Sequence, residues 1–161
     1  MIFSEEKYRF MYAALQEAMK AFEENEVPVG AVIVHQNKII SRGYNQIEKL
    51  KDATAHAEMI AITSAANRLE NWRLNDCSLY LTLEPCIMCT GAILNSRISE
   101  VYFSTYDTKF GACGSIYNIP DENRTNHHLK VYSGLLAEES SNLLKDFFER
   151  LRNKPNSSNF T

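Results

Sequence analysis

At 161 residues, with 45% hydrophobic and 11% aromatic residues, the chain has the usual size of one domain and can build a single packed core. Its formal net charge of −3 argues against a protein that coats nucleic acid non-specifically, because that mode of binding draws its affinity from many lysines and arginines. The first ten residues mix both charge signs, and no apolar run approaches a membrane-spanning length. We therefore expect a soluble, cytoplasmic protein with no membrane partner.

The first part of the chain predicts a helix followed by a β-hairpin. Ser4 can cap the helix, and Pro28 stands just past its acidic end. Apolar residues recur at spacings of three and four, which is the spacing of one helix face. They are Tyr8, Met11, Tyr12, Leu15, Met19 and Phe22. The segments that follow are a strand over residues 29–34, a turn at Gln36 and Asn37, a strand over residues 38–44 and a polar loop over residues 45–53.

The rest of the chain alternates helices with strands, which predicts an α/β fold with helices on the faces of a sheet. Thr54 is the expected N-cap of one helix, and Pro85 suits the first position of another. We expect residues 1–152 to form one domain and residues 153–161, rich in Asn and Ser, to form a disordered tail. The expected elements are a helix over residues 55–68, a strand over 78–83, a helix over 86–95, a strand over 98–103, a loop through Gly111 and Gly114, and a helix over 135–151.

Two short motifs carry metal-binding residues at the expected starts of two helices. His56 lies in the first motif, and Cys86 and Cys89 form a C-x-x-C pair in the second. On a helix the two cysteines share a face, and the positive end of the helix dipole favours their thiolate forms. A histidine with two thiolates is a ligand set that zinc prefers. The sequence therefore predicts one Zn²⁺ bound by these three residues.

A fourth protein ligand decides between a structural and a catalytic zinc site, because structural sites are closed by four protein ligands. Cys77 lies before the strand that leads to Cys86, and six extended residues place it ~20 Å away. Cys113, in the glycine-rich loop, is not excluded by distance. We favour a site with three protein ligands and a water in the open position.

Glu58 is the candidate proton carrier of this site. Residues two apart on a regular helix point in nearly opposite directions, but in the first turn Glu58 can lean past the helix end toward a water on the metal. Zinc lowers the pKa of such a water to about 7, and a carboxylate can take its proton and return it to a leaving nitrogen. The order H-x-E followed by P-C-x-x-C is a known signature of zinc deaminases that act on nucleobases.

With these motifs the chain resembles the bacterial tRNA-specific adenosine deaminases, known as the TadA family. The resemblance runs from about residue 27 to residue 152. It implies a three-layer α/β/α sandwich with a mixed sheet of about five strands, one Zn²⁺ per subunit and a homodimer. It also implies hydrolysis of adenosine to inosine at the wobble position of a tRNA anticodon by a zinc-activated water. The matching segments are residues 27–32 (VPVGAV), 54–58 (TAHAE), 82–89 (TLEPCIMC), 107–112 (DTKFGA) and 146–148 (DFF).

The resemblance further implies a set of substrate contacts. Asn45 would contact the base, Val29 would line its pocket, and Glu84 would lie beside the amino group through its backbone. Asp107 would contact a neighbouring anticodon nucleotide, and the remaining RNA contacts would be Asn126, His127, Phe148 and Arg150. Four of these residues also fit a simpler role: loop closure for Asn45, an exposed loop for His127, core packing for Phe148 and a solvated helix face for Arg150.

Ser104 and Tyr106 depart from the family, which commonly has Gly and a basic residue there. These departures concern the substrate more than the chemistry. A deaminase of a free base or nucleoside, such as guanine or cytosine, would share the metal site and the fold. We expect the C-terminal helix to discriminate: as a cap over a small pocket it would favour a free base, and beside an open groove it would favour tRNA. A zinc-stabilised binding module without turnover is the third possibility.

Overall fold

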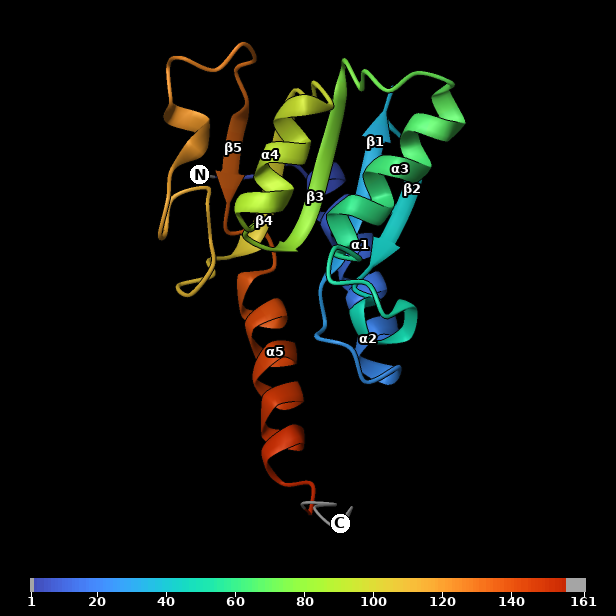
Figure 1. The fold of residues 1–161 in the computed structure, drawn as a ribbon, viewed down its shortest axis with the longest axis vertical. Coiled ribbons are helices and arrows are strands. Elements are labelled where there is room, and N and C mark those ends of the chain that lie inside the picture. The colour runs from blue at the N-terminus through green and yellow to red at the C-terminus, as the bar shows by residue number, and fades with distance from the viewer. Residues whose placement is uncertain (1, 156–161) are drawn as a thin grey trace.

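The computed structural model describes residues 2–155, which fold around one five-stranded sheet of order β2-β1-β3-β4-β5 (Figure 1). Strand β1 runs antiparallel to both of its neighbours, while β3, β4 and β5 run parallel to one another. The strands are β1 (Gly30–His35), β2 (Lys38–Tyr44), β3 (Cys77–Leu83), β4 (Glu100–Thr105) and β5 (Lys130–Ser133). The helices are α1 (Glu5–Glu23), α2 (Ile47–Leu50), α3 (Ala57–Leu69), α4 (Ile87–Asn95) and α5 (Ala137–Arg152), with a 3-10 turn at Ile119–Asp121.

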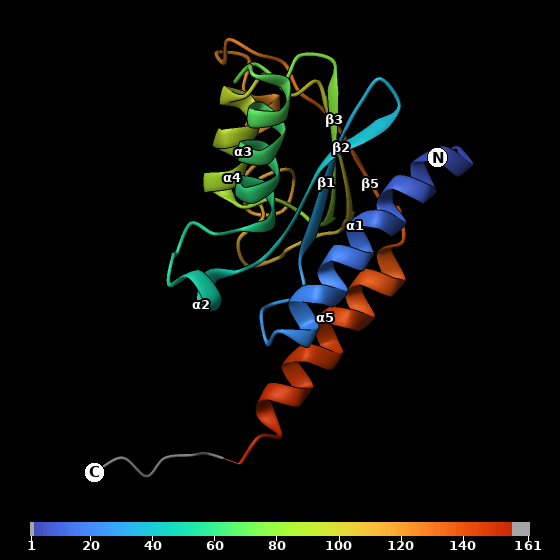
Figure 2. The ribbon, with the colours of Figure 1, turned by 90° about the vertical axis from the view of Figure 1, so that its right-hand side faces the viewer.

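Helices cover both faces of the sheet, so that the molecule has three layers. Figure 2 shows α3 and α4 on one face and α1 and α5 on the other. Strand β1 is buried on both sides, and its residues alternate between two apolar clusters: Ala31 and Ile33 face the α3 side, whereas Val32 and Val34 face α1. The expected three-layer α/β/α sandwich with a mixed sheet is confirmed.

The buried face of helix α1 overlaps only in part with the one that the sequence predicts: Met11 and Leu15 are buried as expected. Ser4 caps the helix, its hydroxyl accepting from the Lys7 amide at 3.4 Å, but Tyr8, Tyr12 and Met19 are exposed. Half of the buried positions on this helix are alanines. The full buried face is Phe10, Met11, Ala13, Ala14, Leu15, Glu17, Ala18 and Ala21. The reason is the close approach of α1 to β1, where a Cβ on Gly30 would overlap the Ala14 carbonyl oxygen.

Both motif helices begin later than predicted. Helix α3 starts at Ala57 with His56 as its N-cap, and helix α4 starts at Ile87 with Cys86 as its N-cap. Thr54 does not cap α3, because its hydroxyl and amide both donate to Asp52. His56 and Cys86 therefore both have extended backbone, which places them at the helix entrances and not on the helix faces.

The hairpin is confirmed: Gln36 and Asn37 adopt positive φ, as a tight turn between two strands requires. The expected polar loop contains the short helix α2, and strand β5 lies in a segment to which the sequence assigned no element. Strand β4 has the expected length but both begins and ends two residues later than expected, at Glu100–Thr105. Of the expected tail, residues 156–161 lie outside the described part of the chain, and residues 153–155 follow α5 without helix.

A row of tyrosines crosses the sheet on the α1 face. Tyr80, Tyr102 and Tyr132 lie side by side on the three parallel strands, and their ring centroids are 4.7 and 4.9 Å apart in successive pairs. This row fills the layer opposite the one that carries the metal-binding motifs. Among residues 2–155, no helix has the length and apolar character needed to cross a membrane.

Candidate active site

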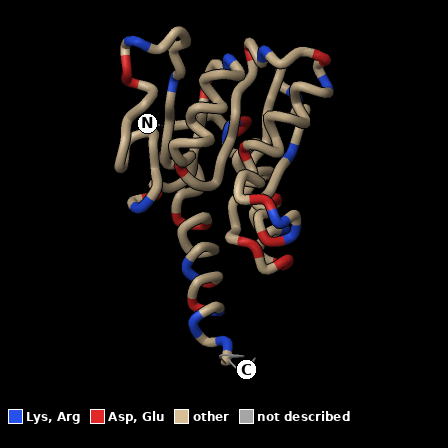
Figure 3. The backbone as a smooth tube through the Cα atoms, viewed as in Figure 1, with Lys and Arg blue, Asp and Glu red and all other residues tan. Residues whose placement is uncertain are grey.

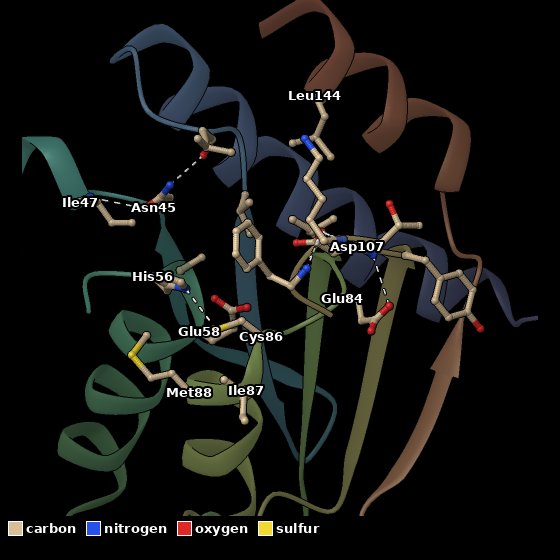
Figure 4. A pocket seen from close by; sticks show the side chains of 18 of the residues that line it. Asn45, Ile47, His56, Glu58, Glu84, Cys86, Ile87, Met88, Asp107 and Leu144 are labelled. Atoms are coloured by element: carbon tan, nitrogen blue, oxygen red, sulfur yellow. Dashed lines mark hydrogen bonds between the residues drawn. The ribbon is translucent and has the colours of Figure 1, made fainter. Parts of the chain in front are cut away.

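The two motifs meet at one edge of the sheet. Strand β3 ends at Leu83 and leads into α4, while α3 lies beside α4 on the same face (Figures 1 and 2). Because α3 and α4 both begin at this edge, their N-cap residues His56 and Cys86 face each other, as Figure 4 shows. The convergence of two segments 30 residues apart in sequence, predicted from the motifs, is confirmed.

The three predicted metal ligands form one cluster. The Nδ1 atom of His56 lies 3.7 Å from the Sγ atom of Cys86 and 3.5 Å from the Sγ atom of Cys89. Each residue offers one ligand atom, and all three atoms lie within 4.8 Å of one another. Within residues 2–155 this is the one group of three or more His, Cys, Asp or Glu residues close enough to share an ion.

The two remaining cysteines stand outside the cluster. Cys77 is buried at the opposite end of β3, where that strand begins. The Sγ atom of Cys113 lies 3.5 Å from the hydroxyl of Thr90, and the thiol is buried. Neither residue belongs to the group of ligand atoms, so the described chain supplies three protein ligands and no fourth.

The cluster favours a thiolate at Cys86. A hydrogen bond from Cys89, together with the neighbouring His56, lowers the pKa of Cys86 to about 4. The hydrogen bond between the two cysteines raises the pKa of Cys89. The hydrogen bond between Cys86 and His56 raises the pKa of His56. Thiolate is the form of cysteine that binds metal, so the site is electrostatically prepared for a cation.

Glu58 stands beside the cluster without belonging to it. It lies in the first turn of α3 and is only 3% exposed, and burial raises its pKa to about 7. Its Oε2 atom is buried and has no hydrogen-bond partner among the described residues. A buried carboxylate oxygen without a partner is costly, which indicates that it serves a group that binds in the cavity.

These residues fit a zinc ion. One imidazole nitrogen and two cysteine sulfurs are ligands that Zn²⁺ prefers, and three protein ligands leave one position for water, as in catalytic zinc sites. The carboxylate of Glu58, whose Oε2 atom has no partner among the described residues, lies beside Cys86 (Figure 4). His56, Cys86 and Cys89 would hold the ion, and Glu58 would remain free of it.

His56 and Cys86 of the cluster, together with Glu58, line a cavity of about 820 Å³. Five of the predicted substrate contacts line this cavity: Val29, Asn45, Glu84, Asp107 and Phe148. They come from four parts of the chain, namely the segments at the ends of the β-hairpin, the end of β3, the loop after β4, and α5. The cavity is large enough for a nucleobase together with part of its surroundings.

The side chain of Glu84 organises the loop after β4. Its carboxylate accepts hydrogen bonds from the amides of Asp107 (3.3 Å), Cys113 (3.2 Å) and Ser115 (3.2 Å), and from the Ser115 hydroxyl at 2.5 Å. The sequence led us to expect a backbone role for Glu84. The structure adds this side-chain role, which had no sequence signal because the donors lie 23 to 31 residues away.

Three other predicted RNA contacts lie outside the cavity wall. The Arg150 guanidinium donates to the Phe22 carbonyl at 2.8 Å and lies over the Phe22 ring, which ties α5 to the end of α1. The His127 ring bonds the carbonyl of Ile98, just before β4 begins and thus toward the opposite edge of the sheet. Asn126 is exposed in the same loop as His127. The structure gives Arg150 and His127 intramolecular partners, and an RNA role for the three residues stays a prediction.

Two aromatic residues at the cavity were not among the predicted contacts. Phe110 is 68% exposed and Tyr106 is 55% exposed, yet both line the cavity. Phe148, for which core packing was the simpler role, is also exposed at the cavity, whereas its neighbour Phe147 is buried. A phenylalanine in a glycine-rich loop, outside any periodic element, is a signal that could have identified Phe110.

Comparison with known proteins agrees with this geometry. Residues 4–105 match the family described as the cytidine and deoxycytidylate deaminase zinc-binding region. A tRNA-specific adenosine deaminase from Aquifex aeolicus is 52% identical over 147 residues, which cover 91% of this chain and 97% of that protein. The tRNA-specific adenosine deaminase of Bacillus subtilis is 46% identical, over 90% of both chains.

Solved structures show the same relationship. A structure from a study of A-to-I editing by tRNA:A34 deaminases at the wobble position is 42% identical, with a TM-score of 0.81 over 84% of this chain and 98% of that chain. A guanine deaminase from Bacillus subtilis is 31% identical, with a TM-score of 0.62 over 99% of this chain and 100% of that chain. Together with the site geometry, these matches show that the chain belongs to the tRNA-specific adenosine deaminases of the cytidine and deoxycytidylate deaminase family.

Proposed function

We propose that the protein hydrolyses adenosine to inosine at the wobble position of a tRNA anticodon, in the cytoplasm. One Zn²⁺ is held by His56, Cys86 and Cys89, and Glu58 moves the protons. The observation that carries the proposal is the buried carboxylate of Glu58, whose Oε2 atom has no partner in the described chain. It lines a large cavity together with His56 and Cys86, two residues of the three-ligand cluster.

The reaction adds water to C6 of adenine and releases ammonia. Bound zinc would supply a water whose pKa is near 7. Glu58 is suited to the proton transfers because burial raises its pKa to about 7, so that it can both accept and donate a proton near neutral pH. It takes the proton that the attacking water loses and delivers it to N1 of the ring. It then takes the proton of the new hydroxyl group on C6 and delivers it to the amino group, so that the C–N bond breaks, the C6 carbonyl forms and ammonia leaves. The products are inosine and ammonia, and the enzyme regains its starting protonation.

The cavity wall orients the base. Val29 offers an apolar surface, and Asn45 lies across the cavity from the loop that carries Asp107 (Figure 4). One carboxylate oxygen of Asp107 already accepts from the amides of Lys109 and Phe110, which leaves its other oxygen for a ligand. Aromatic side chains at the rim suit the splayed bases of an anticodon loop, which need no large basic surface.

The course of α5 supports the tRNA substrate over a free base. In Figure 1 this helix runs away from the sheet edge instead of crossing over α3 and α4. It adds only Leu144 and Phe148 to the cavity wall. Figure 3 shows acidic and basic residues interspersed along it, so its charge alone does not define an RNA surface.

A free-base deaminase is the second candidate, and the observation that favours it is the similarity of this chain to a guanine deaminase from Bacillus subtilis. The deciding experiment offers the zinc-loaded protein an anticodon stem-loop with adenosine at the wobble position, and separately free adenosine, guanine and cytosine. Ammonia release and inosine formation are measured for each. We expect turnover of the stem-loop; turnover of a free base alone would contradict the proposal.

We also propose a homodimer. Ile87 lines the cavity, and the amides of Ile116 and Tyr117 bond to the Gly111 carbonyl in the loop after β4. All three side chains are at least half exposed, and exposed apolar surface is typical of an interface between proteins. Sedimentation of the zinc-loaded protein tests this. The wild type should sediment as a dimer, and Ile116→Glu should shift it toward the monomer; a wild type that stays monomeric at high concentration would contradict the proposal.

A further inference from the structure

Glu26 is a buried carboxylate that the proposed chemistry does not use. Only 1% of its surface is exposed, and it lies outside the metal cluster. Its Oε1 atom accepts from the amide of Glu48 at 2.8 Å, and its Oε2 atom accepts from the amide of Lys49 at 3.0 Å. Both amides belong to the first turn of α2, whose N-cap residue makes no capping bond with its side chain. Glu26 therefore caps α2 from a distant segment.

This cap adjoins the wall of the cavity. The carbonyl of Val27 accepts from the Nδ2 atom of Asn45 at 3.3 Å, and the amide of Ile47 donates to the Oδ1 atom of Asn45 at 3.4 Å (Figure 4). Val27, Asn45 and Ile47 all line the cavity. The Asn45 amide is thus held at both ends by the two segments that Glu26 joins. One N–H and one lone pair of this amide remain for a ligand.

We propose that Glu26 is a positioning residue that fixes the Asn45 amide against the substrate base. By joining the segment of Val27 to the start of α2, it keeps the two hydrogen-bond partners of Asn45 in register. The role of Asn45 toward the base rests on the proposed function, whereas the clamp itself rests on the contacts of Glu26.

The surface offers a second tether between the same two segments, and it is weaker. Lys49 pairs with Glu24 at 3.4 Å, but the two side chains are 53% and 38% exposed. Exposed ion pairs of this kind contribute little, because water and salt screen them. Glu26 is therefore the stronger of the two tethers, and Lys49→Ala is a matched control on the same turn.

Amide hydrogen exchange of the zinc-loaded protein tests the clamp. In Glu26→Gln, one oxygen still accepts, but the new NH₂ group faces the second amide and cannot accept from it. We expect exchange over residues 47–50 to quicken by about tenfold or more, with the sheet core unchanged. Lys49→Ala should change it little. Glu17→Gln, at a second buried carboxylate of the same part of the chain, should leave residues 47–50 unchanged. Unchanged exchange in Glu26→Gln would overturn the proposal.

A double-mutant cycle tests the positioning role. With Asn45 intact, Glu26→Gln should lower kcat by about tenfold or more and leave KM nearly unchanged, because small misplacements of a positioned group mainly cost the chemical step. In the Asn45→Ala background the same substitution should cost less than about twofold, since the group it positions is gone. A merely structural role would lower the melting temperature and give additive losses in the cycle, and additive losses would overturn the proposal.

The cycle is run on whichever compound the wild type deaminates among the stem-loop, adenosine, guanine and cytosine. A failure of the proposed function then appears as inactivity of the wild type on the stem-loop. A failure of the Glu26 role appears as additivity in the cycle, or as unchanged activity in a variant whose exchange has quickened. The two failures are therefore distinguishable.

Discussion

Gly111 packs directly against the carboxylate of Glu84. A Cβ at this position would overlap the Oε2 atom of Glu84 and would lie 2.5 Å from the carbonyl oxygen of Asp107. The loop that lines the cavity after β4 is therefore folded around a buried carboxylate, and it can close on it only because one of its residues has no side chain.

Gly111→Ala should accordingly displace this loop. We expect the free energy of unfolding to fall by about 1–3 kcal/mol and kcat/KM on the stem-loop to fall by about tenfold or more. Denaturant titration and steady-state kinetics measure the two effects. Gly91→Ala is the matched control: apart from its chain neighbours and its own helix backbone, no atom lies within 4 Å of the added Cβ, and alanine in this helix should raise stability by about 1 kcal/mol. A fully active and stable Gly111→Ala would contradict the packing described.

Glu58→Gln should keep the metal and lose the reaction. Because Glu58 is not a ligand, zinc content should remain at one ion per chain by elemental analysis, while kcat falls by about 10²- to 10⁴-fold. This result also separates an enzyme from a binding module that zinc merely stabilises. Loss of zinc from the variant, or turnover at the wild-type rate, would show that the assigned role is wrong.

Cys86→Ser and His56→Ala should lose zinc and unfold at a lower temperature, because metal binding couples to folding. Elemental analysis and thermal melts measure both. Cys113→Ser provides the control, since its sulfur lies against Thr90 and outside the ligand cluster. Full zinc content in Cys86→Ser, or loss of zinc from Cys113→Ser, would require a different ligand set.

When a chelator removes the metal, Cys86 should become open to alkylation, whereas Cys77 and Cys113 should stay protected. Cys86 is half-buried with its pKa lowered to about 4 through its hydrogen bond with Cys89, so it should react quickly with iodoacetamide at pH 8. Burial raises the pKa of Cys77 and of Cys113 to about 11, which leaves roughly one thiol in a thousand ionised at that pH. Mass spectrometry locates the modified residues. Early labelling of Cys77 would contradict the burial described.

Phe110→Ala should weaken action on the stem-loop and spare free adenosine. Stacking of a base on an aromatic side chain contributes about 1–3 kcal/mol, or roughly five- to 150-fold in kcat/KM. Trp72→Ala, another exposed aromatic residue but one outside the cavity, should have no effect on either substrate. If both variants behave like the wild type, Phe110 does not contact the RNA.

The group of three candidate metal ligands could be predicted from the sequence, because residue types and spacing define it, whereas the proton-carrier role of Glu58 stays a prediction. His56, Cys86 and Cys89 are brought together as expected. The hairpin was predictable for a similar reason, since the turn at Gln36 and Asn37 is a local feature.

The contacts that shape the cavity could not be predicted, because they join residues far apart in the chain. Glu84 meets Ser115 across 31 positions, and Glu26 meets Glu48 across 22. Strand β5 has only four residues without clear alternation, and its pairing with β4 is what makes it a strand. The buried face of α1 was predicted only in part, because its large tyrosines dominate the apolar pattern although they are exposed. Alanines, which contribute little to that pattern, form much of the contact face.

The row formed by Tyr80, Tyr102 and Tyr132 gives the protein a built-in optical reporter. Stacked phenol rings fixed in one orientation contribute to near-ultraviolet circular dichroism, a signal that vanishes when side-chain packing is lost. These rings lie on the face of the sheet that the metal ligands do not occupy. Tyr106 lines the cavity and contributes to the same signal, so the part of the signal that Tyr102→Phe removes is the part that follows packing of the α1 layer, apart from events in the layer that carries the zinc site.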